Sequence, residues 1–574
     1  MCGILGEIDF NKENLNIEQF KNNIKSLKNR GPDDIGYWRY QKFLQIGFTR
    51  LSIIDLDHRS NQPMYSDDKN IVMVFNGEIY NYKELKSDLL KKNSKFKTSS
   101  DSEVILELYK LEGCEALKKL RGMFSIVICD LTKQKIFFLR DPFGIKPLYY
   151  FYKDNRLLFS SSVKSLLKFD FIEKKINKES LNFFYFFGAV KENQTIIENI
   201  KAFEPGILYE FKFNNSLFKK KMFDIEELFS NQNRSEIDLK KKFEETLINH
   251  IQSDVPVAVL LSGGLDSSII LNLLNKYKVD IHPFTLGFEQ FKNSKYDEVE
   301  ISKKFCKALN INVKSKYFTN HEILNELDKF FENMDQPTYD GLNTFLITKC
   351  LRKLNFKVAL SGLGADEIFG GYNTFYRMRI LHRLKFIYNN FAFKYLMISL
   401  NKFFKNNKYL IFLELLSIYN KPYQIYLLLR SKKNNLSKIE RKDINSILTE
   451  NLEYSKKDLD DITSLLEIKI YMKNQLLRDT DWASMANSVE VRVPYVDYNF
   501  LKFVKNVKVD FSKGKKFIIS KFAKIPNFIL KRKKTGFTVP YSKIIELYNK
   551  KNNTKYVSWS EICLTEYFKS LKIK

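Results

Sequence analysis

The chain has few of the features that mark secreted, metal-binding or membrane-spanning proteins. Its six cysteines are scattered too widely for a zinc or redox motif, and its five histidines form no metal signature. No charged and apolar leader opens the sequence, and the apolar run at 409–419 is interrupted by Glu414 and too short to span a bilayer. We therefore expect a protein of the reducing cytoplasm without a membrane partner.

Acidic residues are also scarce relative to basic ones. The 67 Asp and Glu face 95 Lys and Arg, which gives a formal net charge of +28 and raises nucleic acid as a partner. The excess is spread along the chain among Asn, Ile and Phe, however, as in a compositionally biased genome. We expect no nucleic-acid partner, and the length of 574 residues predicts two or more domains.

The most informative stretch is residues 256–270, PVAVLLSGGLDSSII. A short apolar run typical of a buried strand is followed by a Gly- and Ser-rich loop and then by the apolar residues of a helix. Gly263 and Gly264 let backbone N–H groups surround an anion, and the helix start favours negative charge. The loop contains no Lys, so it is not a GxxxxGK[ST] phosphate loop, and Asp266 suits a divalent cation beside pyrophosphate. The alternative is a plain strand-to-helix turn.

A second loop repeats this design. SGLGADEIFGGY at 361–372 follows another short apolar run and places Asp366 where it offers a second carboxylate to Mg²⁺. Alone, Asp266 or Asp366 is more often a helix cap. Together they predict a Mg²⁺–pyrophosphate site.

The first residues suggest a different chemistry. Removal of Met1 leaves Cys2 with a free α-amino group beside its thiol, a nucleophile with its own base. Residues 72–75 predict a strand that leads into a tight turn at Asn76-Gly77-Glu78, where a side-chain amide and a bare backbone N–H suit an oxyanion hole. Arg50 precedes a strand-like run at 51–56, and Asp101 either caps a helix or faces a ligand amine.

Most of the first 200 residues predict antiparallel strands. Residues 123–129 with 136–140, and 147–152 with 157–160, alternate like hairpins. The motifs MCGILG, RGPDD, FNGEIYNY, LRGMFS and LRDPFGIKPLYY together resemble the N-terminal-nucleophile glutamine amidotransferase domain. The resemblance implies that Cys2 is the nucleophile and that Asn76 and Gly77 form the oxyanion hole. It further implies that the carboxylate and amine of glutamine are bound by Arg50, Asn76, Glu78 and Asp101.

The second half alternates strands and helices. The strand pattern fades between about 201 and 234, so we place a glutaminase domain at 2–205, a linker at 206–235 and a second domain at 236–574. An amphipathic helix from Leu239 leads to strands at 257–261, 281–288, 313–318 and 356–361, with helices at 298–309 and 322–331 between them. This pattern predicts an α/β parallel sheet with ligands at the carboxyl ends of its strands. Residues 376–470 are helical in pattern and show no chemistry.

SGGLDSS, SGLGADEIFGGY, LLRDTDWASMANSVEVRVPYVD and KRKKTGF together resemble the synthetase domain of glutamine-hydrolysing asparagine synthetases. The full chain is then an α+β N-terminal-nucleophile sandwich followed by an adenine nucleotide α-hydrolase-like α/β domain with helical additions. The resemblance implies that ATP and Mg²⁺ activate aspartate as an acyl-adenylate, which ammonia from glutamine attacks. A homodimer is compatible with it. Further residue roles carry over by motif: ATP contacts at Leu260, Leu286, Ser361 and Gly362, a pyrophosphate cradle of Ser262, Gly264, Asp266 and Ser267, and a phosphate-neutralising Lys534.

One position departs from the family pattern. Many asparagine synthetases carry Glu where this chain has Leu363, and leucine neither takes a proton nor holds an ammonium. The runner-up function is therefore an amidotransferase that acts on another carboxylate, such as a sugar uronic acid of a surface polysaccharide. Glu367 and Glu490 are the nearest candidates to replace the missing carboxylate, and pyrophosphate or AMP oxygens are a third. An RNA-binding enzyme that activates a tRNA base, or an inactive scaffold, fits the filled Cys2 and loop motifs less well.

Overall fold

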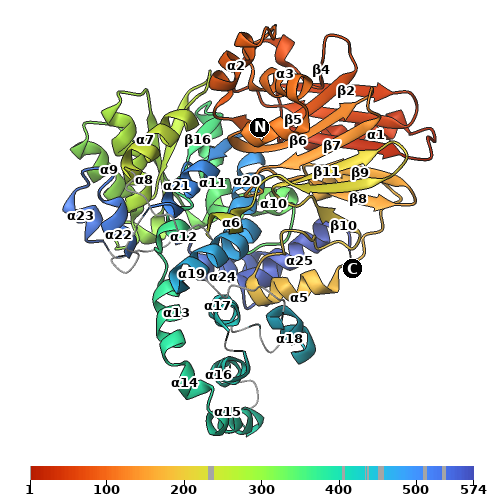
Figure 1. Cartoon of the computed structure of the whole chain (residues 1–574). Coiled ribbons are helices and arrows are strands. Elements are labelled where there is room, and N and C mark those ends of the chain that lie inside the picture. Colours follow the sequence, from red (N-terminus) through yellow and green to blue (C-terminus); the bar gives the residue numbers. More distant parts are fainter. Residues whose placement is uncertain are drawn as a thin grey trace.

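A computed structural model describes residues 2–229, 238–403, 408–419, 421–432, 435, 439–449, 458–507, 514–532 and 538–573. Figure 1 shows an all-antiparallel β half from the N-terminus, an α/β half beside it, and a helical arm that projects away from both. None of the helices in these ranges is long and apolar enough to cross a bilayer.

The N-terminal half is a sandwich of two six-stranded antiparallel sheets, as predicted. Their strand orders are β10-β8-β9-β1-β3-β2 and β12-β11-β7-β6-β5-β4. Apolar side chains from the inner faces, such as Ile4, Val74 and Phe138, pack between the sheets and exclude water. The strands are β1 Gly3–Asp9, β2 Asp34–Tyr40, β3 Leu44–Arg50, β4 Met64–Tyr65, β5 Ile71–Ile79, β6 Gly122–Asp130, β7 Lys135–Arg140, β8 Tyr149–Lys153, β9 Arg156–Ser160, β10 Ile200–Ala202, β11 Ile207–Lys212 and β12 Leu217–Lys221.

Helices cover the outer faces of the sandwich. α2 and α3 pack on the sheet that contains β5, and α1 packs on the sheet that contains β1. The Ser100 side chain caps α3 by accepting a hydrogen bond from the Glu103 N–H, so Asp101 is left for another role. The helices of this half are α1 Ile17–Ile24, α2 Tyr82–Lys91, α3 Asp101–Glu112, α4 Val163–Leu166, α5 Lys178–Phe187 and α6 Ile225–Leu228. Of these, α5 packs against the helical arm and α6 against the helix at Tyr498–Lys505.

Three local predictions for this half are wrong. Residues 51–56 form no strand, and the preceding strand β3 ends at Arg50. Asn76, Gly77 and Glu78 form no turn but continue β5, where they pair with Ser125, Phe124 and Met123 of β6. A Cβ at Gly77 would lie 2.0 Å from the Met123 carbonyl oxygen, so glycine serves close strand packing here. The expected linker holds β11 and β12, which extend the second sheet.

The second half is built on a five-stranded parallel sheet, which confirms the predicted α/β class. Its strand order is β15-β14-β13-β16-β17, and β13, the predicted strand before the first loop, lies at its centre. Parallel strands need helical crossovers, and α8, α9 and α11 provide them. The strands are β13 Val257–Leu261, β14 His282–Phe288, β15 Lys314–Phe318, β16 Val358–Leu360 and β17 Glu490–Arg492.

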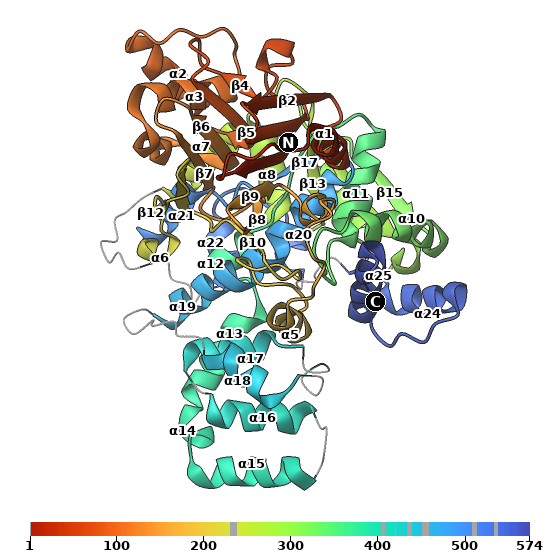
Figure 2. The same ribbon diagram turned by 90° about the vertical axis from the view of Figure 1, so that its right-hand side faces the viewer.

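The helices of this half surround the sheet in both views (Figures 1 and 2). They are α7 Leu239–His250, α8 Leu265–Lys276, α9 Glu298–Ala308, α10 Asn320–Asn333, α11 Leu342–Lys353, α12 Ala365–Phe369, α20 Arg478–Met485, α21 Tyr498–Lys505, α22 Gly514–Ile519, α23 Asn527–Leu530, α24 Tyr541–Asn552 and α25 Trp559–Leu571.

Between α12 and α20 the chain forms the arm, which has its own apolar cluster. Figure 2 shows α14, α15 and α16 at the end farthest from the sheets. The arm helices are α13 Asn373–Arg383, α14 Lys385–Tyr388, α15 Phe391–Phe403, α16 Lys408–Ile418, α17 Pro422–Arg430, α18 Arg441–Thr449 and α19 Leu459–Leu466, and a π-helix at Glu467–Leu477 leads back to α20.

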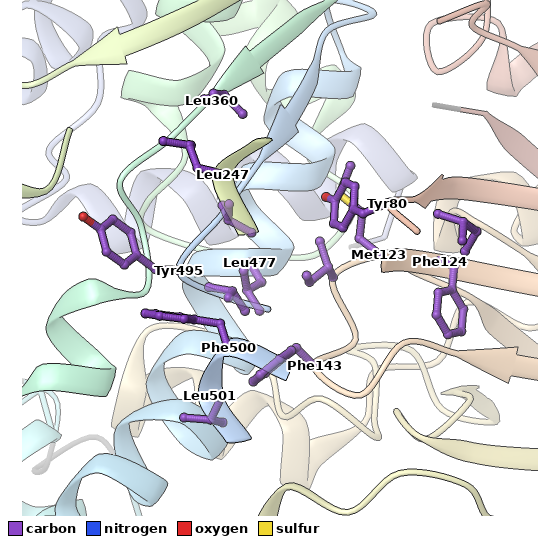
Figure 3. Close-up of a cluster of buried hydrophobic side chains, with 14 of the residues drawn as sticks. Tyr80, Met123, Phe124, Phe143, Leu247, Leu360, Leu477, Tyr495, Phe500 and Leu501 are labelled. Atoms are coloured by element: carbon purple, nitrogen blue, oxygen red, sulfur yellow. The ribbon is translucent and has the colours of Figure 1, made fainter. Parts of the chain in front are cut away.

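A continuous apolar cluster joins the two halves. Met123, Phe124 and Phe143 from the sandwich belong to the same buried cluster as Leu360 and Leu477 from the α/β half. Figure 3 shows these side chains between the two sets of elements. The two halves therefore share one core and hold each other in a fixed orientation.

Candidate active sites

The first candidate site surrounds Cys2, immediately before β1. A pocket beside it is lined by the predicted residues Cys2, Arg50, Gly77, Glu78 and Asp101, together with side chains from the 51–62 loop and α3. Parts of the chain that lie up to 99 residues apart in sequence thus meet at one point, as the motif-based prediction requires.

Asn76 is oriented by the backbone of Cys2. The Cys2 N–H donates to Asn76 Oδ1 at 2.9 Å, and Asn76 is fully buried. Its Nδ2 has no hydrogen-bond partner within the described part of the chain. A buried amide donor without a partner costs free energy. Asn76 itself does not line the pocket, whereas its neighbours Phe75 and Gly77 do.

Two carboxylates stand on the other side of the pocket. Glu78 Oε1 is buried and has no hydrogen-bond partner among the described residues, whereas Glu78 Oε2 accepts from Arg492 Nη2 at 2.7 Å. Asp101 Oδ2 accepts from the Ile79 N–H at 3.1 Å, and burial raises the pKa of Asp101 to about 6. Two buried acceptors at one wall suit a cationic amine.

Arg50 forms the cationic part of the pocket. Its guanidinium donates to the backbone oxygens of Asp55 and Asp57 and to Asn61 Oδ1, which fixes its position. Burial raises the pKa of the Cys2 thiol, whereas a Leu51 backbone hydrogen bond and the Arg50 charge act in the opposite direction. The pocket thus combines a thiol, a cation and two acceptors, and the Asn76 amide is bonded to the backbone of its Cys2.

The second candidate site lies at the carboxyl ends of β13 and β16. The loop after β13 contains Gly263 in the left-handed region at φ 59°, and Gly264 is the N-cap of α8. Ser267 and Ser268 lie in the first turn of that helix, and the Ser262 N–H donates to Ser267 Oγ at 3.4 Å. The loop and helix N-terminus that we predicted for an anion are therefore present.

The loop after β16 packs against the first one. A Cβ at Gly362 would lie 2.8 Å from the Ser267 nitrogen and 3.0 Å from the Asp266 Cβ, so only glycine allows this approach. The Ser361 N–H donates to the Arg492 carbonyl oxygen at 2.9 Å. Leu260 is half-buried, whereas Leu286 is fully buried in the sheet, so its side chain contacts the core and only its backbone is left for a nucleotide.

Asp266 and Asp366 converge on one side chain, Lys515. Lys515 Nζ donates to both Asp266 oxygens at 2.8 and 2.7 Å and also to Asp366 Oδ1. The ammonium therefore stands where two carboxylates converge, and these oxygen ligands fit Mg²⁺. No group of three or more His, Cys, Asp or Glu side chains suited to a metal occurs among the described residues, so phosphate oxygens and waters would complete the coordination.

Some functional residues were missed by the sequence analysis, and one lies outside the described residues. Lys515 had no signal in a Lys-rich chain, and Arg532 Nη1 donates to the carbonyl oxygens of Ser262 and Gly263 in the first loop. Lys534 belongs to 533–537, which the structure does not describe.

The arm also approaches the second site. The Arg430 guanidinium of α17 lies 4.7 Å from the Tyr372 ring centroid, and Tyr372 Oη donates to Glu367 Oε1 at 2.7 Å. Glu367 follows Asp366 in α12, and burial and Asp366 together raise its pKa to about 7. Glu490, the other carboxylate that we considered near Leu363, is instead bound by Arg492 Nε at 2.6 Å.

Comparison with known proteins assigns each half of the chain to a family model. Residues 1–222 match the model of a glutamine amidotransferase domain, and residues 238–555 match the asparagine synthase model. This chain belongs to the asparagine synthase family. It is 32% identical over 578 residues to the glutamine-hydrolysing asparagine synthetase 1 of Bacillus subtilis (strain 168), covering 94% of this chain and 87% of that protein.

Two further relatives cover less of the chain. A putative glutamine-hydrolysing asparagine synthetase 2 of Methanocaldococcus jannaschii is 35% identical over 67% of this chain and 78% of its own length. The glutamine-hydrolysing asparagine synthetase 2 of Bacillus subtilis is 33% identical over 65% of this chain and 52% of its own length. As a member of this family, the chain combines a glutamine amidotransferase half and an asparagine synthase half.

Proposed function

We propose that the chain is a glutamine-dependent asparagine synthetase that converts aspartate, ATP and glutamine into asparagine, AMP, pyrophosphate and glutamate. The observation that carries the proposal is the presence of two complementary candidate sites in two halves that share one apolar cluster. A thiol pocket with unpaired donor and acceptor atoms supplies ammonia, and a two-loop anion site with paired aspartates activates a carboxylate. We further propose that these roles divide between the half before residue 230 and the half that begins at residue 238.

In the first half the side chains match the needs of glutamine hydrolysis. Arg50 binds the α-carboxylate of glutamine, and Glu78 and Asp101 bind its α-ammonium. The α-amino group of Cys2 takes the thiol proton, and the thiolate attacks the carboxamide carbon. Asn76 Nδ2 and the Gly77 N–H donate to the developing oxyanion, the proton passes to the leaving ammonia, and water then hydrolyses the thioester.

In the second half the loops bind the triphosphate. Ser262, Gly264 and Ser267 hold the pyrophosphate at the α8 N-terminus, and Ser361 and Gly362 lie against the nucleotide. Mg²⁺ held by Asp266 and Asp366 supplies charge neutralisation when bound. Lys515 places further positive charge beside the phosphates, and the KRKKTGF motif assigns the same role to Lys534. The acceptor carboxylate displaces pyrophosphate from the α-phosphorus to give an acyl-adenylate.

Ammonia must cross from one half to the other without being protonated by bulk water. The shared apolar cluster joins the two halves, from Met123 and Phe124 to Leu360 and Leu477 (Figure 3), and would surround ammonia on its way between the sites. An apolar environment favours neutral ammonia over ammonium, because burying an unpaired charge is costly.

The identity of the acceptor carboxylate distinguishes the proposed function from the alternative one. Leu363 is half-buried and packs against the apolar core. A leucine side chain supplies no carboxylate at this position. Glu367, beside Asp366, is better placed than the Arg492-bound Glu490 to take the proton that ammonia sheds. The same apolar position also favours the alternative, a related amidotransferase that acts on a sugar uronic acid.

Pyrophosphate release with a panel of acceptors tests the proposal. Purified enzyme receives ATP, Mg²⁺, glutamine and either aspartate, glutamate, glucuronate or galacturonate. We expect aspartate alone to stimulate pyrophosphate release well above the acceptor-free rate. Stimulation by a uronic acid and none by aspartate would transfer the assignment to the alternative.

A further inference from the structure

Arg492 belongs to the synthetase half but contacts the glutamine pocket. It is the last residue of β17, is fully buried, and its Nη2 donates to Glu78 Oε2 at 2.7 Å. The two residues are 414 positions apart in sequence. The bond leaves Glu78 Oε1 facing the pocket, where it has no hydrogen-bond partner among the described residues.

The Arg492 guanidinium is held from several sides by its own half. Its Nε donates to Glu490 Oε1 at 2.6 Å, and its Nη1 donates to the carbonyl oxygens of His250 and Gln252 at 2.8 and 2.6 Å. These bonds fix the plane of the guanidinium, which can therefore impose one orientation on the Glu78 carboxylate. Arg492 also opposes the effect of burial, which raises the pKa of Glu78.

The backbone of Arg492 reaches the other site. Its carbonyl oxygen accepts from the Ser361 N–H at 2.9 Å, in the loop that carries the proposed ATP contacts. His250 and Gln252 precede β13, which leads into the other loop. One residue thus contacts the glutamine pocket through its side chain and the nucleotide loop through its main chain.

We propose that Arg492 is a positioning residue for glutamine, which completes the glutamine pocket from the synthetase half and links it to the nucleotide loop. This inference rests on the proposed glutaminase role of the first site. It does not depend on which carboxylate is the acceptor. Glu78 binds the α-ammonium of glutamine with the oxygen that Arg492 leaves open, so loss of Arg492 weakens glutamine binding more than the chemical step.

The test compares glutaminase kinetics of Arg492→Gln, Arg492→Lys and a matched control. The control is Arg121→Gln, because Arg121 also joins the two halves, through Asp497 at 2.8 Å and Thr246 at 2.7 Å, but does not contact Glu78. We expect Arg492→Gln to raise the KM for glutamine about tenfold or more with a smaller change in kcat, as for a lost ground-state contact. Arg492→Lys keeps the charge and should recover part of the loss.

Ammonia-dependent pyrophosphate release provides the second readout and should stay within about twofold of wild type in Arg492→Lys. An unchanged KM for glutamine in both Arg492 variants would overturn the proposal. So would an equal loss in Arg121→Gln, or equal losses of glutaminase and ammonia-dependent activity in the soluble Lys variant. Glutaminase activity is measured without an acceptor. If aspartate proves not to be the acceptor, the KM for glutamine of the Arg492 variants therefore still tests this proposal.

A separate observation concerns the far end of the arm. Phe386, Phe391, Tyr395 and Leu396 are between 52 and 79% exposed, although large apolar side chains are usually buried. Figure 2 shows α14 and α15, which carry them, at the tip of the arm. Between residues 368 and 413 the sequence contains eight Lys and Arg and no Asp or Glu.

Exposed aromatic side chains in a segment that carries basic and no acidic residues are complementary to an anionic lipid surface. Aromatic rings enter the headgroup region, and each nearby Lys or Arg adds attraction to anionic lipids. Because the arm holds this tip away from both candidate active sites, contact there leaves the sites accessible. We propose that the tip of the arm binds the surface of an anionic bilayer.

Vesicle sedimentation at physiological ionic strength tests this second proposal. We expect binding to mixed phosphatidylglycerol–phosphatidylcholine vesicles, little binding to pure phosphatidylcholine, and a loss of about tenfold or more in Phe386→Ser/Phe391→Ser. This variant keeps the net charge, so non-specific attraction is unchanged. Phe218→Ser is the control, since Phe218 is 60% exposed on β12, away from the arm. Equal vesicle binding by the double variant and by Phe218→Ser would overturn the proposal. It would also be overturned if the double variant bound vesicles normally but lost self-association or RNA binding.

Discussion

The oxyanion role of Asn76 gives the sharpest single-residue prediction. Asn76 is fully buried in β5, its Oδ1 accepts from the Cys2 N–H at 2.9 Å, and its Nδ2 has no partner within the described residues. Asn76→Ala removes the donor and the acceptor together. The nucleophile, the Gly77 N–H and the two carboxylates for the glutamine amine all remain.

The expected loss follows from these contacts. Removal of one preorganised oxyanion donor costs about 2.7–4 kcal/mol of transition-state stabilisation, or about 10²–10³-fold in kcat. Because Asn76 Oδ1 also holds the Cys2 backbone, the effect should lie toward the upper end of this range. The KM for glutamine should change less, since the donor acts on the oxyanion and the substrate's charged groups are bound elsewhere.

The assay measures glutamate release and, separately, ammonia-dependent pyrophosphate release. Ser125→Ala is the matched control, because Ser125 pairs with Asn76 across β5 and β6 and is equally buried, but its hydroxyl makes no hydrogen bond to Cys2. We expect Asn76→Ala to lose only the glutaminase reaction. A kcat within about threefold of wild type, or an equal loss in Ser125→Ala, would refute the oxyanion assignment.

Four further outcomes are expected. Cys2→Ala should abolish glutamine-dependent synthesis while free ammonia still supports it, and loss of both in folded protein would contradict separate sites. Asp266→Asn and Asp366→Asn should each stop acceptor-dependent pyrophosphate release but leave glutaminase activity measurable. Near-normal synthesis by either variant would indicate that the substituted Asp only caps a helix. Leu363→Glu should not improve asparagine formation, because an unpaired carboxylate against the core costs on the order of a few kcal/mol or becomes protonated; a faster variant would contradict this. Since the pKa of Asp101 is about 6, its charge is present above that pH, so kcat/KM for glutamine should fall as the pH drops below about 6, and a flat profile would argue against Asp101 as an amine ligand.

Local pattern predicted most of the α/β half. The strand before the first loop was placed at 257–261 and is β13 Val257–Leu261, and the strand expected at 281–288 is β14 His282–Phe288. These elements have strong apolar runs bounded by Gly and polar residues, so short-range sequence decides them. Convergence of Asp266 and Asp366 also followed, because parallel strands bring their carboxyl ends to one edge.

The errors arose where distant contacts outweigh local preference. Asn76-Gly77-Glu78 reads as a turn in isolation, but pairing with β6 keeps it extended. β12 Leu217–Lys221 is exposed along its whole length and therefore shows no apolar alternation, as expected for a charged edge strand. The bonds of Arg492 to Glu78 and of Lys515 to Asp266 and Asp366 join segments that only the fold brings together.

The central claim is that glutamine nitrogen reaches an activated aspartate within this one chain. The most direct measurement supplies ATP, Mg²⁺, aspartate and glutamine labelled at the amide with the heavy nitrogen isotope, with unlabelled ammonium in excess outside. We predict asparagine that carries the label and forms in equal amount with pyrophosphate. Unlabelled asparagine would contradict internal transfer, and absence of asparagine with pyrophosphate formed only from another carboxylate would contradict the proposed acceptor.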